Sequence, residues 1–503
     1  MRSLGFDVKA ASGAEDAGAL LSAVPAGERV ALVDPRFVGH VHALRLALTD
    51  PRFPAAVDDE AVRLRSAVKA HDGFFTTFFI SPYSRYIARW CARRGLTPNQ
   101  VTTASLLTAL IAAGCAATGE RGGYVAAGVL LLVSFVLDCT DGQLARYALK
   151  YSTMGAWLDA TFDRAKEYAF YAGLALGAAR GGDDVWALAL GAMILMTCRH
   201  VVDFSFNEAN HDATANTSPT AALSDRLDGL GWTVWARRMI ILPIGERWAM
   251  IAVLTAFTTP RIVFWALIIG CAFGACYTTA GRVLRSVTRK ARRTDRAAQA
   301  LADLADSGPL ADVVRGQLSR TGIVRLQPLV LALIASGALL AAVLGRPFGS
   351  RQVIVAAVFY VVFSAAAVAR PLKGALDWLV PPVFRAAEYT TVLVLAARSD
   401  EPQALPAAFG LVAAVAYHHY DTVYRIRGGT GAPPAWLVRV TGGHEGRTLL
   451  VTVLAALLAD RGDDFTLALT ALAVAVALVV LVESIRFWVS SGAPAVHDEG
   501  ETA

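Results

Sequence analysis

The chain has 503 residues, of which 55% are hydrophobic and 17% are charged, and its formal net charge is +6. This composition is typical of a polytopic membrane protein and excludes a soluble multidomain enzyme. The net charge is modest, and we expect no nucleic-acid partner. The six cysteines lie mostly within apolar stretches and lack the paired spacing of a metal site, so we interpret them as buried thiols.

Residues 1–70 are expected to form a small cytoplasmic segment. They are mixed and polar, without the basic start and apolar stretch of a signal peptide. A buried strand is predicted over 29–34 and a helix over 38–48. The segment is too short for a complete nucleotidyltransferase, and a docking or regulatory role is the favoured interpretation.

Aromatic and basic side chains alternate between residues 73 and 94. This pattern predicts an amphipathic helix in the membrane interface, with its basic residues directed towards anionic headgroups. The sequence Thr97-Pro98 follows it. Because Thr97 can cap a helix and proline is tolerated in the first helical turn, a membrane helix is expected to begin here.

Six apolar segments complete a predicted transmembrane domain over residues 71–285. The segments cover about 100–118, 122–141, 155–178, 185–205, 246–258 and 262–280. Most are long enough to cross a bilayer, although the fifth is short. Lys and Arg gather on one side of these segments, whereas the opposite loops carry acids such as Glu120 and Asp183. The positive-inside rule therefore predicts a multi-pass cell-membrane protein with both ends of this domain in the cytoplasm.

Residues 286–327 are charged and are predicted to form a cytoplasmic linker. A second apolar domain over residues 328–490 contains six more expected membrane helices, near 328–345, 352–369, 376–397, 404–420, 448–459 and 465–485. Residues 491–503 are expected to be a disordered tail. The predicted fold class is therefore all-α, with two six-helix transmembrane units in one chain.

Four aspartates lie close together in the apolar surroundings of the first unit. On helices, Asp138 and Asp141 share one face, and Asp159 and Asp163 share one face of the next helix. Small residues between the acids are expected to let the two helices approach closely. Carboxylates within a membrane are costly and usually mark a functional site. Converging carboxylates suit hard divalent cations, Mg²⁺ or Mn²⁺, so the cluster predicts a phosphate-handling site.

The acids belong to a longer pattern, D-x2-D-G-x2-A-R-x8-G-x3-D-x3-D. Its fixed positions are filled by Asp138, Asp141, Gly142, Ala145, Arg146, Gly155, Asp159 and Asp163. This pattern resembles the signature of the CDP-alcohol phosphotransferase family, and the resemblance covers about residues 72–285. Members of that family transfer a substituted phosphate group from a CDP-linked donor to an alcohol acceptor and release CMP. The resemblance implies an integral-membrane enzyme of phospholipid synthesis that uses two Mg²⁺ or Mn²⁺ ions.

The resemblance also implies roles for individual residues. The expected metal ligands are Asp138, Asp141, Asp159 and Asp163, and Asp163 is also the expected general base. Expected nucleotide contacts are Gly142, Ala145, Arg146, Gly155, Asn99 and Thr102. Three arginines at cytoplasmic helix ends are expected to bind an acceptor that carries phosphate, such as an inositol phosphate: Arg199, Arg247 and Arg282. Ordinary snorkelling at the interface is the alternative interpretation of these arginines.

The second unit contains short matches to the first. Arg385-x-x-Glu388-Tyr389 parallels Arg164-x-x-Glu167-Tyr168, His418-x-x-Asp421 parallels His200-x-x-Asp203, and Glu445 with Arg447 parallels Glu246 with Arg247. The metal ligands do not recur. Ala365 and Ala366 stand at the positions of Asp141 and Gly142, and Val380 and Phe384 stand at those of Asp159 and Asp163. The second unit is then either an inactive repeat that packs against or regulates the first, or an unrelated bundle with chance matches.

Two versions of the transferase remain open, one with CDP-diacylglycerol as the donor and one with a soluble CDP-linked polyol such as CDP-inositol. An open lateral groove beside Asp138 would favour the first, and a closed polar cavity the second. A twelve-helix transporter with two related halves is the alternative from another class. Against it, all the clustered acids lie in one half and match a catalytic pattern. Membrane lipids are expected partners, and so is a second copy of the chain in a homodimer, unless the second unit replaces that partner.

Overall fold

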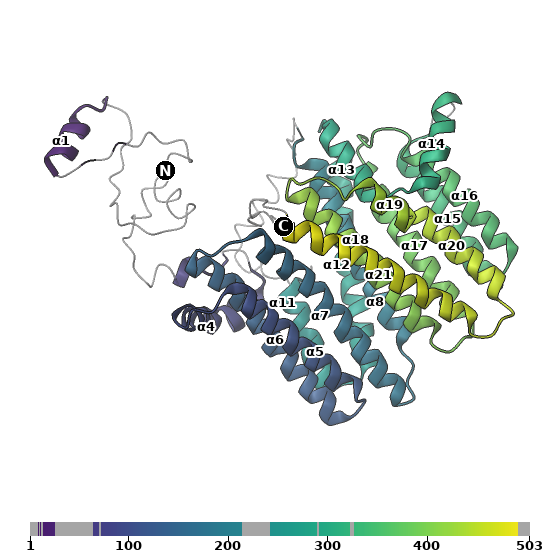
Figure 1. The fold of residues 1–503 in the computed structure, drawn as a ribbon, viewed down its shortest axis with the longest axis horizontal. Coiled ribbons are helices and arrows are strands. Elements are labelled where there is room, and N and C mark those ends of the chain that lie inside the picture. The colour runs from purple at the N-terminus through teal and green to yellow at the C-terminus, as the bar shows by residue number, and fades with distance from the viewer. Residues whose placement is uncertain are drawn as a thin grey trace.

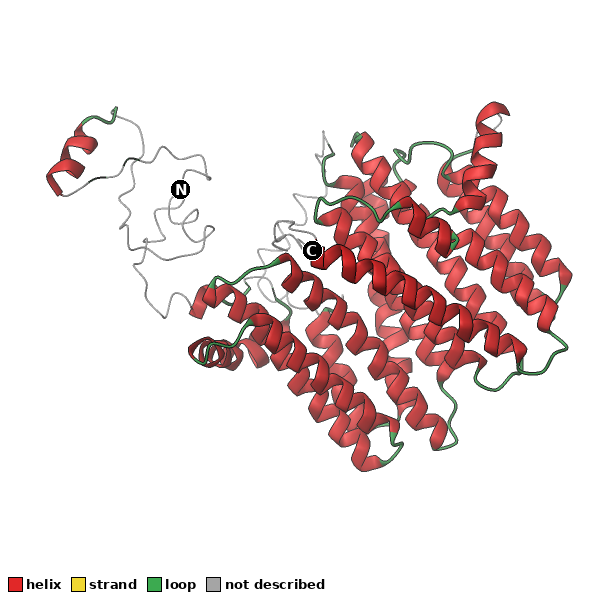
Figure 2. Ribbon diagram, viewed as in Figure 1, coloured by secondary structure: helices red, strands yellow, loops and turns green. Residues whose placement is uncertain are grey.

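The computed structural model describes residues 14–25, 64–69, 72–213, 242–288, 291–321 and 326–490, together with Lys9 and Ala11. All the secondary-structure elements in this part of the chain are helices, as Figure 2 shows, so the all-α fold class is confirmed. Of residues 1–70, the structure describes a short helix, α1 (Ala14–Ser22), and the stretch 64–69. The strand expected over 29–34, the helix over 38–48 and the tail 491–503 lie outside the described residues.

The helices of the first unit form at the predicted positions. They are α5 (Pro98–Ala117), α6 (Arg121–Ala148), α7 (Thr153–Arg180), α8 (Trp186–Asn210), α11 (Ile244–Phe257) and α12 (Pro260–Thr288). α5 packs against both α6 and α7, α6 also packs against α11, and α8 packs against α12 (Figure 1). α5 therefore supports both helices that carry the aspartates.

The second unit also forms at the predicted positions. Its helices are α15 (Pro328–Gly345), α16 (Arg351–Ala367), the short 3₁₀ helix η3 (Asp377–Leu379), α17 (Val380–Arg398), α18 (Ala404–Arg427), α19 (Ala435–Thr441), α20 (Gly443–Leu458) and α21 (Asp464–Ser490). The stretch 286–327, which we expected to be a linker, contains two helices, α13 (Asp295–Ala305) and α14 (Pro309–Thr321). The region between the units is thus more ordered than its charge suggested.

Seven helices in the described part of the chain are long and apolar enough to cross a membrane: α5, α6, α8, α12, α15, the joined η3–α17 segment and α21. The other predicted spans are too short or carry several charged side chains, as α7 does at Asp159, Asp163 and Lys166. Large apolar side chains are exposed on the outer helices, for example Ile111 on α5 and Phe273 on α12. By helix length and composition the chain is a multi-pass membrane protein, and the count of twelve crossings stays a prediction.

The predicted amphipathic helix is present as a π-helical turn, η2 (Thr76–Ile80), that continues into α4 (Ser81–Arg93). Its exposed residues include the aromatic side chains of Phe78, Phe79, Tyr83, Tyr86 and Trp90. Its inner face is small and polar, and Ser84 Oγ donates to Oε1 of Gln143 on α6 at 2.8 Å. An exposed aromatic face beside arginines supports the prediction that this helix lies in the membrane interface.

Local sequence determines where the site-bearing helices begin and end. α5 starts with a capping box, in which Thr97 Oγ1 accepts from the Gln100 N–H at 3.3 Å and Gln100 Oε1 accepts from the Thr97 N–H at 2.9 Å. α6 ends at Leu149, which has a left-handed φ of 53°, and Ser152 caps α7 by accepting from the Gly155 N–H at 2.9 Å. This short turn brings the last turns of α6 and the first turns of α7 to the same end of the bundle.

Gly177 lies where α7 closely approaches α5. A Cβ atom at this position would lie 2.0 Å from the carbonyl oxygen of Ala116, so an alanine would force the two helices apart. We expect Gly177→Ala to lower the free energy of unfolding in detergent by about 1–3 kcal/mol. Gly114→Ala on α5 is the matched control, because a Cβ atom there meets nothing within 4 Å and the change favours helix. Equal stability of the two variants would contradict this packing.

Candidate functional site

Three of the four predicted aspartates converge. Carboxylate oxygens of Asp138, Asp141 and Asp159 all lie within 4.8 Å of one another. Asp138 and Asp141 come from the last turns of α6, and Asp159 comes from the start of α7. Asp141 is buried and Asp159 is exposed, so the cluster begins inside the bundle and opens at its surface. The helical spacing in the sequence predicted this convergence.

The small residues of the signature contribute in a different way from the one expected. We expected Gly142, Ala145 and Gly155 to let α6 and α7 pack directly, but the main packing partner of both helices is α5. Gly155 faces α5, since a Cβ atom there would lie 2.9 Å from Oδ1 of Asn99. A larger residue at position 155 would therefore displace Asn99 from the site.

The oxygen donors of this cluster fit a divalent cation. Carboxylate oxygens are the donors that Mg²⁺ and Mn²⁺ prefer. Oδ2 of Asp141 is buried and makes no hydrogen bond with any described group. A buried carboxylate oxygen without a partner is destabilising unless a ligand binds it. Asp138, Asp141 and Asp159 could therefore hold a metal ion together.

Asp163 lies beside this cluster and forms an ion pair with Lys166. Its Oδ1 is 2.9 Å from Nζ of Lys166. Lys166 also hydrogen-bonds Asp138, and it donates to Ser105 Oγ on α5 at 3.3 Å. Among the described residues, Lys166 is the one cation that forms an ion pair with any of the four acids, so the cluster keeps an excess of negative charge that favours cation binding. Sequence reasoning missed Lys166, although its i,i+3 spacing from Asp163 could have revealed the pair.

α5 brings two further predicted residues to the acids. Thr102 is buried beside Asp141, and its hydroxyl donates to the carbonyl oxygen of Pro98 at 3.0 Å. Asn99 lies against Gly155, next to the start of α7. The structure therefore places the beginning of α5 beside the aspartate cluster, and the contact of these two residues with a nucleotide stays a prediction.

Arg146 and the half-buried Ala145 lie one turn beyond Asp141 on α6. Nε of Arg146 donates to the carbonyl oxygen of Ala67 at 2.5 Å, so the stretch 64–69 reaches this side of the site. The guanidinium group of Arg146 also lies over Gly142, 3.4 Å from where a Cβ atom would stand. Arg146 thus connects the N-terminal segment to the helix that carries two of the aspartates.

The three predicted acceptor arginines fall into two groups. Arg199 of α8 and Arg247 of α11 are both buried and lie close enough to repel each other. Nη2 of Arg247 is 3.7 Å from Oε2 of Glu167 on α7. Arg282 instead forms an ion pair with Asp203 of α8. The structure therefore brings Arg199 and Arg247 together, and it pairs Arg282 with Asp203, an acid that also lies near Arg199.

Two family models match the chain. Residues 95–275, which contain all four aspartates, match the model described as CDP-alcohol phosphatidyltransferase. This segment belongs to the CDP-alcohol phosphatidyltransferase family. The second model, described as a family of unknown function (DUF5941), matches residues 295–503. The boundary between the two matches falls between the two six-helix units.

Relatives of the phosphatidyltransferase domain carry related names. Phosphatidylinositol phosphate synthase from Streptomyces avermitilis is 32% identical over 130 residues, and archaetidylinositol phosphate synthase from Pyrococcus horikoshii is 33% identical over 113 residues. A bifunctional IPC transferase and DIPP synthase from Rubrobacter xylanophilus is 42% identical over 84 residues. These matches cover 24%, 22% and 16% of this chain and 51%, 58% and 18% of the relatives. The chain thus spans about half the length of the first two relatives.

Proposed function

We propose that the phosphatidyltransferase domain transfers a substituted phosphate group from a CDP-linked donor to an alcohol acceptor and releases CMP. One observation carries this proposal: Asp138, Asp141 and Asp159 converge within a complete family signature, and a buried oxygen of Asp141 lacks a hydrogen-bond partner among the described groups. We propose CDP-diacylglycerol as the donor and an inositol phosphate as the acceptor.

The reaction forms one bond and breaks one bond at the same phosphorus atom. The acceptor oxygen attacks the phosphorus that carries the donor's alcohol, and the bond from this phosphorus to the CMP oxygen breaks. Divalent cations held by Asp138, Asp141 and Asp159 would offset the charge of the diphosphate and of the departing CMP. Asp163 would accept the proton of the attacking hydroxyl, because it lies beside the cluster without belonging to it.

Lys166 orients Asp163 in this scheme. It contacts both Asp163 and Asp138, and Ser105 anchors it on α5. The carboxylate of Asp163 is therefore held at a fixed place next to the metal ligands. A base held in place needs less rearrangement when the acceptor hydroxyl arrives.

The nucleotide would lie where α5, α6 and α7 meet. This region contains the proposed contacts Asn99, Thr102, Gly142, Ala145, Arg146 and Gly155. The planar guanidinium group of Arg146 is suited to phosphate oxygens. The distribution of basic residues supports placing this region at the cytoplasmic side of the membrane.

Two observations support a phosphorylated acceptor. Arg199 and Arg247 are buried as neighbours of like charge, and an acceptor phosphate between them would relieve their repulsion. The names of the relatives from Streptomyces avermitilis and Pyrococcus horikoshii both contain inositol phosphate. Arg282 would join such a pocket only by exchanging its ion pair with Asp203 for the acceptor.

The release of CMP tests this proposal. The full chain, purified in detergent, is incubated with Mg²⁺, radiolabelled CDP-diacylglycerol and a panel of alcohols that includes inositol phosphate. We expect CMP release that requires inositol phosphate and stops when EDTA removes the metal. Turnover of CDP-inositol in place of the lipid donor would assign the soluble-donor version. An absence of CMP release from every CDP-linked donor would contradict the proposed function.

A further inference from the structure

The two six-helix units repeat one order of packing. In the first unit α4 packs on α6, α5 on α6 and α7, α6 on α11, and α8 on α12. In the second unit α14 packs on α16, α15 on α16 and α17, α16 on α20, and α18 on α21. Each of these helices has a counterpart at the same place in chain order. The helix α14, which lies inside the expected linker, takes the place of the amphipathic helix α4.

A buried ion-pair network recurs on the third and fifth helices of the two units. In each unit an arginine and a glutamate three residues later on the third helix form an ion pair, and an arginine of the fifth helix approaches the same glutamate. Within the third helix the ion-pair distance is 2.7 Å in the first unit (Arg164–Glu167) and 2.8 Å in the second (Arg385–Glu388). From the arginine of the fifth helix to the same glutamate it is 3.7 Å in the first unit (Arg247–Glu167) and 2.6 Å in the second (Arg447–Glu388). The short sequence matches thus correspond to equivalent contacts.

A second contact recurs at the start of the η2–α4 segment and at the start of α14. Glu246, near the start of α11, accepts from the Phe75 N–H at 3.3 Å. Glu445, near the start of α20, accepts from the Gly308 N–H at 2.9 Å and the Ala311 N–H at 3.1 Å. In both units a glutamate of the fifth helix therefore caps the helix that precedes the first membrane helix.

A third contact recurs between the fourth and last helices. Asp203 of α8 forms an ion pair with Arg282 of α12. Asp421 of α18 accepts from Ser484 and from the indole N–H of Trp488 on α21, both at 2.7 Å. Three equivalent polar contacts, made by equivalent helices in the same order, are difficult to explain by chance matches.

The second unit has lost the groups that would bind metal. Phe384, at the position of Asp163, is fully buried and stacks on His444 with ring centroids 4.3 Å apart. Val380, at the position of Asp159, and Ala365, at the position of Asp141, are also fully buried. Apolar side chains therefore fill the place where the first unit gathers its acids.

In the second unit both arginines of the ion-pair network meet acids of the same unit. Asp306 accepts from Arg447 at 2.7 Å and from Arg385 at 3.3 Å, so two arginines there meet two acids, Asp306 and Glu388. Burial alone would raise the pKa of Asp306, but its ion pair with Arg447 helps to hold that pKa well below the usual range. The balanced charges indicate a structural core rather than a site for an anion.

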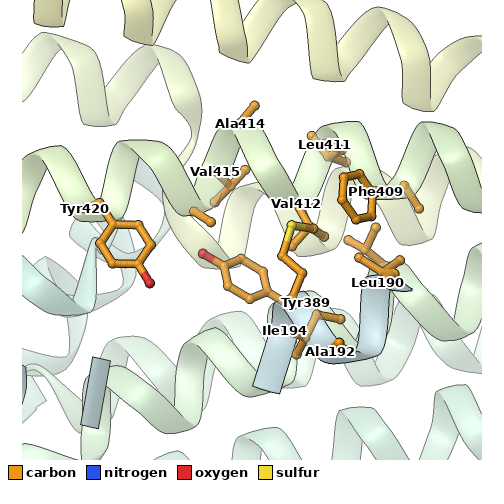
Figure 3. Packing of buried hydrophobic residues seen from close by; sticks show 14 of the residues in the cluster. Leu190, Ala192, Ile194, Tyr389, Phe409, Leu411, Val412, Ala414, Val415 and Tyr420 are labelled. Carbon is orange, nitrogen blue, oxygen red and sulfur yellow. The ribbon is translucent and has the colours of Figure 1, made fainter. Parts of the chain in front are cut away.

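The units meet through their third and fourth helices. α8 packs against α17 and α18, and α7 also contacts α18. Figure 3 shows Leu190 and Ile194 of α8 close to Phe409 and Val412 of α18, with Tyr389 of α17 beside them. Because each unit presents the same pair of helices, the contact has the form of a twofold dimer interface.

We propose that residues 307–490 are a degenerate second copy of the phosphatidyltransferase unit and act as its built-in partner. The chain is then a fused pseudo-dimer with one active site. This places the family of unknown function that matches residues 295–503 in the same fold as the catalytic unit. The inference depends on the repeated contacts and not on the identity of the substrates.

Tyr420 is the residue through which the second copy reaches the active unit. Its hydroxyl contacts Nδ1 of His200, and the guanidinium carbon of Arg164 lies 5.0 Å from the centre of its ring. Trp488 also stacks on Trp157 of α7, with ring centroids 6.3 Å apart. The second copy therefore braces α7, the helix that carries Asp159 and Asp163. We assign Tyr420 as a positioning residue for Arg164 and, through Glu167, for Arg247.

The number of chains per particle tests the pseudo-dimer. Native mass spectrometry of the full chain released from nanodiscs, combined with cross-linking, should show α8 cross-linked to α17 and α18 of its own chain. We expect a particle with one copy of the chain, or a particle with several copies in which α8 does not contact another copy. Cross-links that join α8 of one copy to α8 of another would overturn the proposal, because that face would then serve a true dimer.

A matched pair of tyrosines tests the positioning role. Tyr420→Phe and Tyr360→Phe each remove a hydroxyl that meets Nδ1 of a histidine, but Tyr360 bonds His444 at 2.8 Å inside the second copy. We expect Tyr420→Phe to raise the KM of the phosphorylated acceptor about tenfold, without changing the KM of the CDP-linked donor. Tyr360→Phe should leave both constants within twofold. Equal KM values for the acceptor in the two variants would overturn the positioning role of Tyr420. A wild-type chain without transferase activity would contradict the proposed function, and the cross-linking test of the pseudo-dimer would still apply.

Discussion

Asp163→Asn should lower kcat by about 10²–10⁴-fold, because an amide cannot accept the proton of the acceptor hydroxyl. The fold should survive, since Lys166 keeps its contact with Asp138 and the three converging aspartates are unchanged. Release of CMP measures turnover, and binding of CDP in the presence of Mn²⁺ shows whether the nucleotide site is intact. We expect the variant to bind CDP as the wild type does.

Asp183→Asn is the control for this substitution. Asp183 is a partly exposed acid between α7 and α8. It forms an ion pair with Arg261 at the end of α7 opposite to the aspartate cluster. Its replacement removes one carboxylate from the same unit and should leave kcat unchanged. Normal turnover by Asp163→Asn would exclude Asp163 as the base.

Asp141→Asn should weaken Mn²⁺ binding about 100-fold or more and abolish turnover, because a neutral amide is a much poorer ligand for a hard cation. Isothermal titration calorimetry or Mn²⁺ electron paramagnetic resonance measures the affinity. Oδ2 of Asp141 is buried without a hydrogen-bond partner among the described groups, so the change should not lower the melting temperature in the absence of metal. A variant that loses cation binding and keeps its stability would identify a functional carboxylate.

Asp312→Asn supplies the comparison for metal binding. Asp312 is an exposed acid on α14 and lies 2.5 Å from Arg315. Its loss changes the net charge by the same amount and should leave Mn²⁺ affinity unaltered. Similar Mn²⁺ affinities for the Asp141 and Asp312 variants would show that the cation binds elsewhere.

The helices could be predicted because apolar length and periodicity are local properties of a sequence. All twelve predicted membrane segments correspond to helices. α7 is one of these helices, but its charged residues exclude it from the set that is apolar enough to span a membrane. The convergence of Asp138, Asp141 and Asp159 followed from spacing along two consecutive helices. Contacts between two consecutive helices can be predicted without knowing how the rest of the bundle packs.

The contacts that sequence reasoning missed join distant segments. Tyr420 meets His200 across 220 positions of the chain, and no local pattern marks that pair. Lys166 also contacts Asp138 and Ser105, which lie 28 and 61 positions away in the chain. The packing of α5 against both α6 and α7 likewise depends on the whole bundle, so the role of Gly155 against Asn99 emerged only from the structure.

The repeat also separates the transferase from the transporter alternative. A transporter with two related halves would be expected to place its binding groups where the halves meet. Here the clustered acids lie within one unit, and apolar residues such as Phe384 and Val380 occupy the corresponding place in the other. The asymmetry favours one catalytic unit supported by an inactive partner.

A structure of the full chain with Mn²⁺ and CDP, recorded with anomalous scattering at the manganese edge, tests the central claim most directly. We predict manganese bound directly by carboxylate oxygens of Asp138, Asp141 and Asp159, in contact with the diphosphate of CDP. Asp163 should face the outer phosphorus of CDP, which is the one that carries the alcohol in the donor. Manganese bound elsewhere, or CDP ordered away from these aspartates, would contradict the account.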